Sequence, residues 1–138
     1  MRITATSVWI DRYRSVVDDG RGHSVIVDLP MEQDGADTGA TGIELAAMAF
    51  AGCVTTIFKV IATKRKFEFK NLKVKLDAEK PNETNTITKV TGKAEIITSA
   101  EEAEARTVFR LTEEVCPVGV LFAKAGLKPE WQVTVKKA

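Results

Sequence analysis

Apolar residues gather most densely between Glu44 and Lys59, a run that contains no charged side chain. The run is too long for a typical strand and is rich in alanine, so it predicts a helix from Thr41 to about Lys64. Thr41-x-x-Glu44 matches a capping box, in which the hydroxyl and the carboxylate each accept a hydrogen bond from a backbone amide. The pattern therefore predicts a long, buried helix with Cys53 near its centre.

The chain before this helix has the pattern of short strands separated by turns. Apolar and polar residues alternate loosely over Arg2–Trp9, and further strands are predicted over Tyr13–Val17 and Ser24–Leu29. The turn sequence Asp18–Gly22 joins the last two into a hairpin. Residues Glu32–Ala40 are polar, acidic and glycine-rich, which predicts a mobile loop before the helix.

Three more strands are predicted after the helix. Leu72–Glu79 alternates cleanly between apolar and charged residues, a pattern typical of an antiparallel strand with one solvated face. Thr86–Ile97 is a longer strand, with a possible bend at Gly92, and Trp131–Lys136 closes the chain.

Two further helices are predicted between the last two strands. Ser99-x-x-Glu102 resembles a second capping box and would begin a helix that runs to about Val115. Cys116-Pro117 interrupts it, and because proline suits the first position of a helix, Cys116 should cap a short helix that ends by Gly126. The predicted order, β-β-β-α-β-β-α-α-β, indicates one α+β domain over residues 1–138.

Composition and charge narrow the functional classes. The formal net charge is +1, which argues against nucleic acid as the main partner. The charge-free run is about 14 residues, short of the ~20 that span a bilayer, and no signal-peptide pattern follows Met1. We therefore expect a soluble, cytoplasmic protein without a membrane partner. In that compartment its two cysteines would be thiols between turnovers.

Cys53 and Cys116 are the main candidates for reactive residues. A thiol at a helix N-terminus is favoured as a thiolate, which applies to Cys116, and the small residues before Cys53 leave space for a substrate or a second thiol. Buried cysteines are also often inert core residues. A metal site is not predicted, because His23 is the sole histidine and no Cys-x-x-Cys motif is present. The same shortage of histidine argues against a Cys/His nucleophilic dyad.

A redox dithiol remains as the interpretation that uses both cysteines. Such a pair needs a cation near the reactive thiolate, and Arg12 and Arg14 are both candidates. Glu44 could orient one of these arginines, or it could serve only as a helix cap. Both arginines could equally be ordinary surface charges.

Two segments give the chain its resemblance to a known family. They are GIELAAMAFAGC, which ends at Cys53, and VCPVGVLF, which contains Cys116-Pro117. In this order, and with these elements between them, they resemble the family of osmotically inducible protein C (OsmC) and organic hydroperoxide resistance protein (Ohr).

The resemblance implies an α+β, intertwined homodimer whose antiparallel sheets wrap around long central helices. It implies a thiol peroxidase that acts on organic hydroperoxides without a metal or bound cofactor. Cys53 would be the peroxidatic thiol and Cys116 the resolving thiol, and a dithiol of the dihydrolipoyl type would reduce their disulfide. Glu44 and an early arginine, Arg12 or Arg14, would hold the thiolate.

Two other functional readings stay open. One is a non-peroxidatic dimer that binds a small sulfur-containing or acyl ligand between its subunits, and the other treats both cysteines as core residues. Met48, Phe50 and Phe58 could line a pocket for an alkyl group or simply pack in the core.

Overall fold

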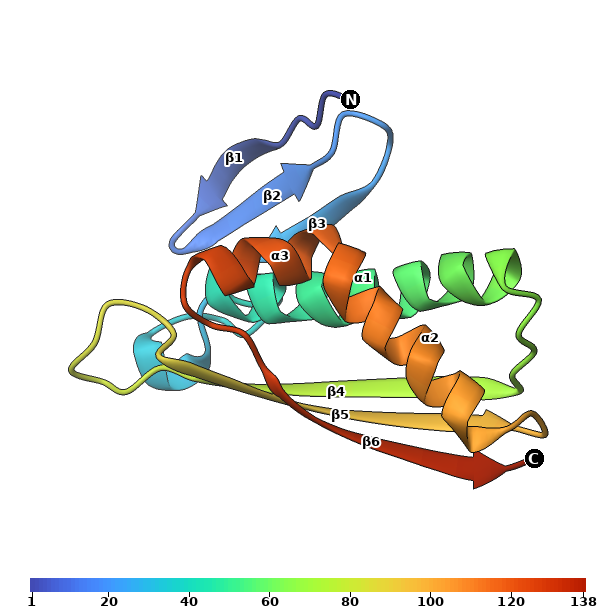
Figure 1. The fold of residues 1–138 in the computed structure, drawn as a ribbon. Helices are drawn as coiled ribbons and strands as arrows, with labels where there is room; N and C mark the ends of the chain where they lie inside the picture. The colour runs from blue at the N-terminus through green and yellow to red at the C-terminus, as the bar shows by residue number, and fades with distance from the viewer. The chain divides into compact units, whose positions relative to one another are not determined.

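The computed structural model describes residues 1–138, which form two compact units, Met1–Ala46 and Ala47–Ala138 (Figure 1). The predicted α+β class and the order of strands and helices are confirmed. In chain order the elements are β1 (Thr6–Asp11), β2 (Arg14–Asp18), β3 (Ser24–Val27), the 3-10 helix η1 (Met31–Gln33), α1 (Gly42–Lys64), β4 (Asn71–Glu79), β5 (Lys89–Thr98), α2 (Glu102–Val115), α3 (Pro117–Lys124) and β6 (Glu130–Lys137).

The first unit is built on an antiparallel sheet in the order β1-β2-β3. Val16 on the central strand pairs with Val8 on one side and Ile26 on the other. Strand β1 begins at Thr6, later than the predicted Arg2, and β3 ends at Val27, before the predicted Leu29. Many large apolar side chains of this sheet are exposed, Trp9 among them at 69%. The sheet thus presents apolar surface that this unit leaves uncovered.

Buried Asp28 organises the polar segment that was predicted as a loop. Its carboxylate accepts hydrogen bonds from the Thr38 amide (3.0 Å), the Thr38 hydroxyl (2.6 Å) and the Leu29 amide (2.7 Å). These bonds, led by the Thr38 hydroxyl, lower the pKa of Asp28 to about 2 even though burial opposes the shift. Gly35 is required because a Cβ there would lie 1.8 Å from the Leu29 carbonyl oxygen. The segment is therefore held by specific hydrogen bonds and close packing.

The second unit places α2, α3 and its part of α1 over one face of the sheet β4-β5-β6 (Figure 1). Strand β5 is central; it pairs antiparallel with β4 and parallel with β6. The expectation of purely antiparallel sheets is wrong for the β5–β6 pair. The connection through α2 and α3 returns the chain to the starting end of the sheet, so β6 runs in the same direction as β5.

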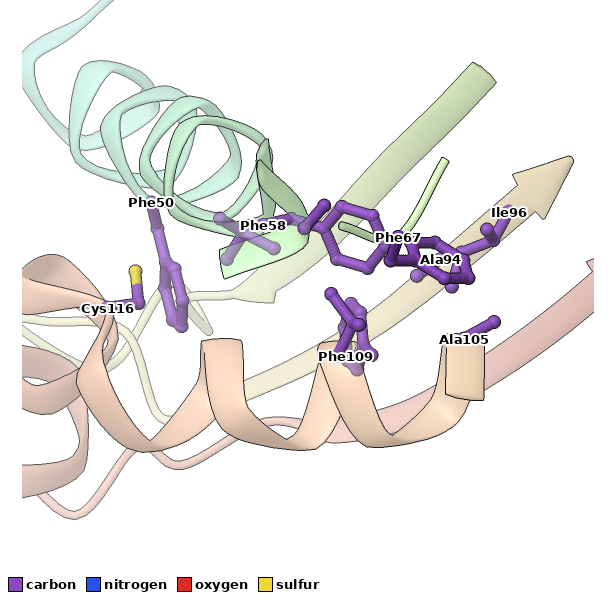
Figure 2. Packing of buried hydrophobic residues seen from close by; sticks show 11 residues of the cluster. Phe50, Phe58, Phe67, Ala94, Ile96, Ala105, Phe109 and Cys116 are labelled. Atoms are coloured by element: carbon purple, nitrogen blue, oxygen red, sulfur yellow. The ribbon is translucent and has the colours of Figure 1, made fainter. Parts of the chain in front are cut away.

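The core of this unit lies between the helices and the sheet. Four α1 side chains spaced four residues apart are buried, which places them along one side of the helix. The Phe58 ring lies in the centre of the cluster, with its centroid 5.1 Å from that of Phe69 and 6.4 Å from that of Phe109 (Figure 2). These buried α1 residues are Phe50, Val54, Phe58 and Ala62. Met48 by contrast is exposed, so of the three proposed pocket residues only Phe50 and Phe58 belong to the core.

By length and mean hydropathy, α1 meets the criteria for a helix that could cross a membrane. Core helices of soluble proteins meet the same criteria. Within the most apolar 18-residue window of α1, 22% of the residues are buried.

The helix caps agree with the sequence at two of three places. Thr41 and Glu44 form the predicted capping box, and Cys116 is the N-cap of α3 with Pro117 at the first helical position. The prediction of a second capping box at Ser99 and Glu102 is wrong. Helix α2 begins at Glu102, and its N-cap, Glu101, makes no side-chain cap bond. Thr98, one residue before Ser99, instead accepts a hydrogen bond from the Ala100 amide.

Gly92 marks a close contact between strands rather than a bend. The register between β4 and β5 is uninterrupted at this residue, and a Cβ here would lie 2.4 Å from the ring of Trp131 on β6. The glycine is needed because the Trp131 ring occupies the space of a side chain.

We expect Gly92→Ala to lower the free energy of unfolding by about 1–3 kcal/mol, because the methyl group would displace a packed aromatic ring. Gly52→Ala is the matched control, since nothing lies within 4 Å of a Cβ at that position. It should stabilise the α1 helix by about 0.5–1 kcal/mol. Urea denaturation of the three proteins measures both effects, and equal stability of wild type and Gly92→Ala would contradict the packing argument.

We also expect Asp28 to contribute to stability only when ionised. Its pKa is lowered, so the contribution is complete above the ordinary value of 3.8 and is lost as the pH falls through about 2. The difference in urea midpoint between wild type and Asp28→Asn should therefore be largest near neutral pH and shrink between pH 4 and pH 2. A difference that stays constant over this range would show that the carboxylate charge is irrelevant.

Candidate thiol site

Cys53 and Cys116 are brought together by the fold of the second unit. Cys53 lies in the middle of α1 and is half-buried, whereas Cys116 lies between α2 and α3 and is only 1% exposed. The two thiols are close enough that Cys53 raises the pKa of Cys116, and no disulfide joins them. Two thiols far apart in the sequence thus form one interacting pair.

The position of Cys116 follows from the helix break that surrounds it. Its amide donates to the Thr112 carbonyl at 2.9 Å and ends α2, while Pro117 begins α3. Its side chain lies beside the Phe50 ring of α1 (Figure 2). A Cβ at Gly119 would lie 3.2 Å from that ring and 3.5 Å from the Cys116 Cβ, so the glycine leaves the thiol and the ring room to pack.

Burial determines the protonation state of Cys116. Desolvation, then the hydrogen bond to Cys53 and the charge on Cys53, raise the pKa of the Cys116 thiol to about 11. The amides of Gly119 and Val118 at the start of α3 act in the opposite direction and are outweighed. The prediction that the helix N-terminus would favour a Cys116 thiolate is therefore wrong, because burial dominates.

The pair is consequently asymmetric. Cys53 has the greater exposure and lies in the middle of α1. Cys116 keeps its proton and has almost no contact with solvent. The geometry fits an exposed nucleophile backed by a protonated partner.

A cavity of about 370 Å³ adjoins Cys116 in the same unit. Its walls are mostly apolar and come from α1, α3 and the start of β6, and its charged residues come from the end of α2, the end of α3 and the loop that follows. The lining residues are Phe50, Val54, Glu113, Glu114, Cys116, Gly119, Val120, Ala123, Lys124, Lys128, Pro129 and Trp131. Phe50, one of the proposed pocket residues, therefore does line a pocket. This pocket is lined by Cys116, however, and not by Cys53.

The two glutamates in this cavity differ. Glu114 forms an ion pair with Arg110 at 2.8 Å. Glu113 forms no ion pair, and burial raises its pKa above the ordinary value, against the opposing charge of Lys128. Sequence reasoning missed Glu113; the only available signal was its position three residues before Cys116, one helical turn away.

The other predicted site residues lie in the first unit. Glu44 caps α1, and its bonds with the amide and hydroxyl of Thr41 lower its pKa. Arg14 makes a two-pronged ion pair with Asp11, at 2.8 and 2.9 Å. Arg12, in the β1–β2 turn with a φ of 44°, donates to the Asp34 carbonyl. All three have structural partners here, and their role beside a thiolate stays a prediction.

Comparison with known proteins assigns the chain to a family. The model of the OsmC-like protein family matches residues 35–132, which is more than half of the chain. The protein belongs to the OsmC-like family. A search of curated proteins gave no match.

Solved structures of OsmC-like proteins share this fold over almost the whole chain. An OsmC-like protein from Mycoplasma pneumoniae has a TM-score of 0.86 at 14% identity, with 99% of this chain and 98% of that chain covered. An organic hydroperoxide resistance protein from Elizabethkingia anophelis, with thiocyanate bound, has a TM-score of 0.74 at 19% identity and coverages of 100% and 97%. The organic hydroperoxide resistance protein OsmC from Legionella pneumophila has a TM-score of 0.71 at 17% identity, with coverages of 99% and 97%.

This OsmC-like chain has no group of three or more His, Cys, Asp or Glu side chains placed to hold a metal ion. Its one concentration of reactive side chains is the thiol pair with the adjoining cavity.

We expect Cys53→Ala to lower the pKa of Cys116, because the substitution removes both the acceptor sulfur and its charge. The pKa should remain above the ordinary value, since desolvation is the largest cause of the shift. The pH dependence of thiolate absorption, measured in Cys53→Ala and compared with the two-thiol protein, provides the test. An unchanged Cys116 pKa would mean that the two sulfurs do not interact.

Proposed function

We propose that this protein is a thiol-dependent peroxidase that reduces organic hydroperoxides, with Cys53 as the peroxidatic and Cys116 as the resolving thiol. The observation that carries the proposal is that the fold brings the two thiols together as an interacting pair, one half-buried and the other fully buried. Membership of the OsmC-like family supports a peroxide-related role. Two structures with the same fold bear the name organic hydroperoxide resistance protein.

The proposed reaction has two steps on the enzyme. The Cys53 thiolate attacks the terminal oxygen of the hydroperoxide, the O–O bond breaks, and the alkoxide leaves as an alcohol after taking a proton. Cys53 becomes a sulfenic acid. The Cys116 sulfur then attacks the Cys53 sulfur, an S–S bond forms, and hydroxide leaves and is protonated to water. A dithiol of the dihydrolipoyl type would return two electrons and restore both thiols.

A cation beside the Cys53 thiolate would complete this site. Arg12 and Arg14 are the proposed sources, with Glu44 orienting the one that is used. In the first unit Arg14 is held by both oxygens of Asp11 and Arg12 bonds only a backbone carbonyl, so Arg12 gives up the weaker contact if it moves.

We further propose that the protein acts as a homodimer in the cytoplasm. The first unit supports the dimer, because its sheet leaves Val8, Trp9, Ile10 and Val25 exposed. Large apolar side chains that the subunit itself leaves exposed are often covered at protein interfaces.

A second candidate function is the binding of a small sulfur-containing or acyl ligand without peroxide chemistry. The observation that favours it is the mostly apolar cavity beside Cys116, whose volume of about 370 Å³ suits a small molecule. In this case the two thiols would share the site without forming a disulfide. The interaction between the two thiols, which raises the pKa of Cys116, favours the dithiol cycle instead.

We expect reduced protein to lose both thiols within minutes when it is mixed with one equivalent of cumene hydroperoxide. Cys53→Ser should not react, because it lacks the nucleophile. Cys116→Ser should stop at the sulfenic acid, which dimedone traps and mass spectrometry detects. Dihydrolipoamide should regenerate both thiols in the wild type.

Retention of both free thiols in the presence of excess hydroperoxide would refute the peroxidase and leave the ligand-binding function. Loss of the remaining Cys116 thiol in Cys53→Ser at the rate of thiol loss in the wild type would show that Cys53 is not the nucleophile. Sedimentation of the reduced protein would test the dimer separately.

A further inference from the structure

Cys116 must lose a proton to close the disulfide, yet the structure opposes this loss. With a pKa of about 11, about one Cys116 side chain in ten thousand is ionised at pH 7. The thiol is 1% exposed, so a base from bulk solvent has almost no access to it. The protein therefore needs a base of its own close to Cys116.

Glu113 is the group in the right place. It lines the same cavity as Cys116 and precedes it by one helical turn. It has no ion-pair partner, unlike Glu114, which is bound to Arg110. The other charged residues of the cavity are Lys124 and Lys128, which cannot accept a proton while they are cationic.

The cavity gives the two residues a common space. Both Cys116 and Glu113 line its volume of about 370 Å³, which leaves the Glu113 carboxylate room to turn towards the thiol.

We propose that Glu113 accepts the proton of Cys116 when Cys116 attacks Cys53 to form the disulfide. The proposal rests on the proposed function for its physiological setting. In that setting the Cys116 S–H bond breaks, the S–S bond forms and the S–O bond of the Cys53 sulfenic acid breaks. Cys116 is oxidised, Cys53 is reduced, and the proton held by Glu113 neutralises the hydroxide that leaves as water.

The environment of Glu113 suits this task. Burial raises its pKa above the ordinary value and makes it a stronger base than an exposed carboxylate, while the charge of Lys128 acts against this shift. Glu114 adds a like charge that acts in the same direction as burial. Burial, Lys128 and Glu114 together set the pH above which Glu113 can accept the proton of Cys116.

The proposal can be tested without any peroxide. Cys53, the more exposed thiol, first reacts with dithiobis(nitrobenzoate), which leaves one thionitrobenzoate on the Cys53 sulfur and releases the other as a first coloured equivalent that is removed before closure is followed. Cys116 then attacks the Cys53 sulfur of this mixed disulfide and expels coloured thionitrobenzoate, so the rate of colour release measures disulfide closure. Cys116→Ser shows the background, because it cannot close.

In the wild type, closure should slow as the pH falls through the pKa of Glu113 and be nearly independent of pH from there to mildly alkaline conditions. In Glu113→Gln, closure should be at least about tenfold slower at pH 7, because a general base contributes roughly 10²–10⁴-fold. Its rate should rise about tenfold per pH unit, following the ionisation of Cys116 itself. The two proteins should therefore converge as the pH approaches 11.

Two further variants make the test specific. Glu114→Gln is the matched control, because it removes the neighbouring carboxylate and leaves Glu113 in place. Its disulfide should form at nearly the wild-type rate. Lys128→Met leaves Glu113 in place and removes the charge that lowers its pKa, so the fall in rate should move to higher pH. Lys128→Met also tests the proton transfer to Glu113 if Glu113→Gln does not fold.

A wild-type rate and pH profile in Glu113→Gln overturns the proposal. So does an equal loss of rate in Glu114→Gln, or an unshifted profile in Lys128→Met. If hydroperoxides leave both thiols intact while thionitrobenzoate release still depends on Glu113, the proposed peroxidase function is wrong. The proposed proton transfer from Cys116 to Glu113 is then still supported.

Discussion

Burial of the Cys116 thiol against Phe50 is the constraint on which the candidate site depends. It leaves one sulfur almost without solvent contact and raises its pKa to about 11, so this thiol stays protonated beside Cys53. Two chemically identical side chains thereby acquire different properties. The fold achieves this difference through packing alone, with the helix break at Cys116-Pro117 directing one cysteine into the core and the middle of α1 leaving the other half-exposed.

The same burial explains why the cavity matters. A thiol that is well protected from solvent is also slow to ionise, so protection and reactivity conflict. In the proposed reaction a cavity lined by both Cys116 and Glu113 reconciles them, because it places a base beside a sulfur that stays buried. Phe50 and Gly119 contribute to both features, since they pack against Cys116 and also line the cavity.

The first unit raises a separate question of function. Its carboxylates are used structurally: Asp28 holds the segment up to Thr38, Asp11 holds Arg14, and Glu44 caps α1. Each of these interactions fixes the backbone locally. An active-site role for Glu44 or for either predicted arginine would therefore have to coexist with, or displace, a contact that already stabilises this unit.

The sequence alone determined the order of elements, the long central helix with its capping box, and Cys116 as the cap of the last helix, because each is a local property of neighbouring residues. Tertiary structure decided the rest. Pairing of β6 parallel to β5, the contact of Gly92 with Trp131, the protonation of Cys116 and the presence of Glu113 in its cavity all depend on residues distant in the chain. A helix N-terminus favours a thiolate wherever it occurs, but only the packed structure shows that desolvation outweighs it here.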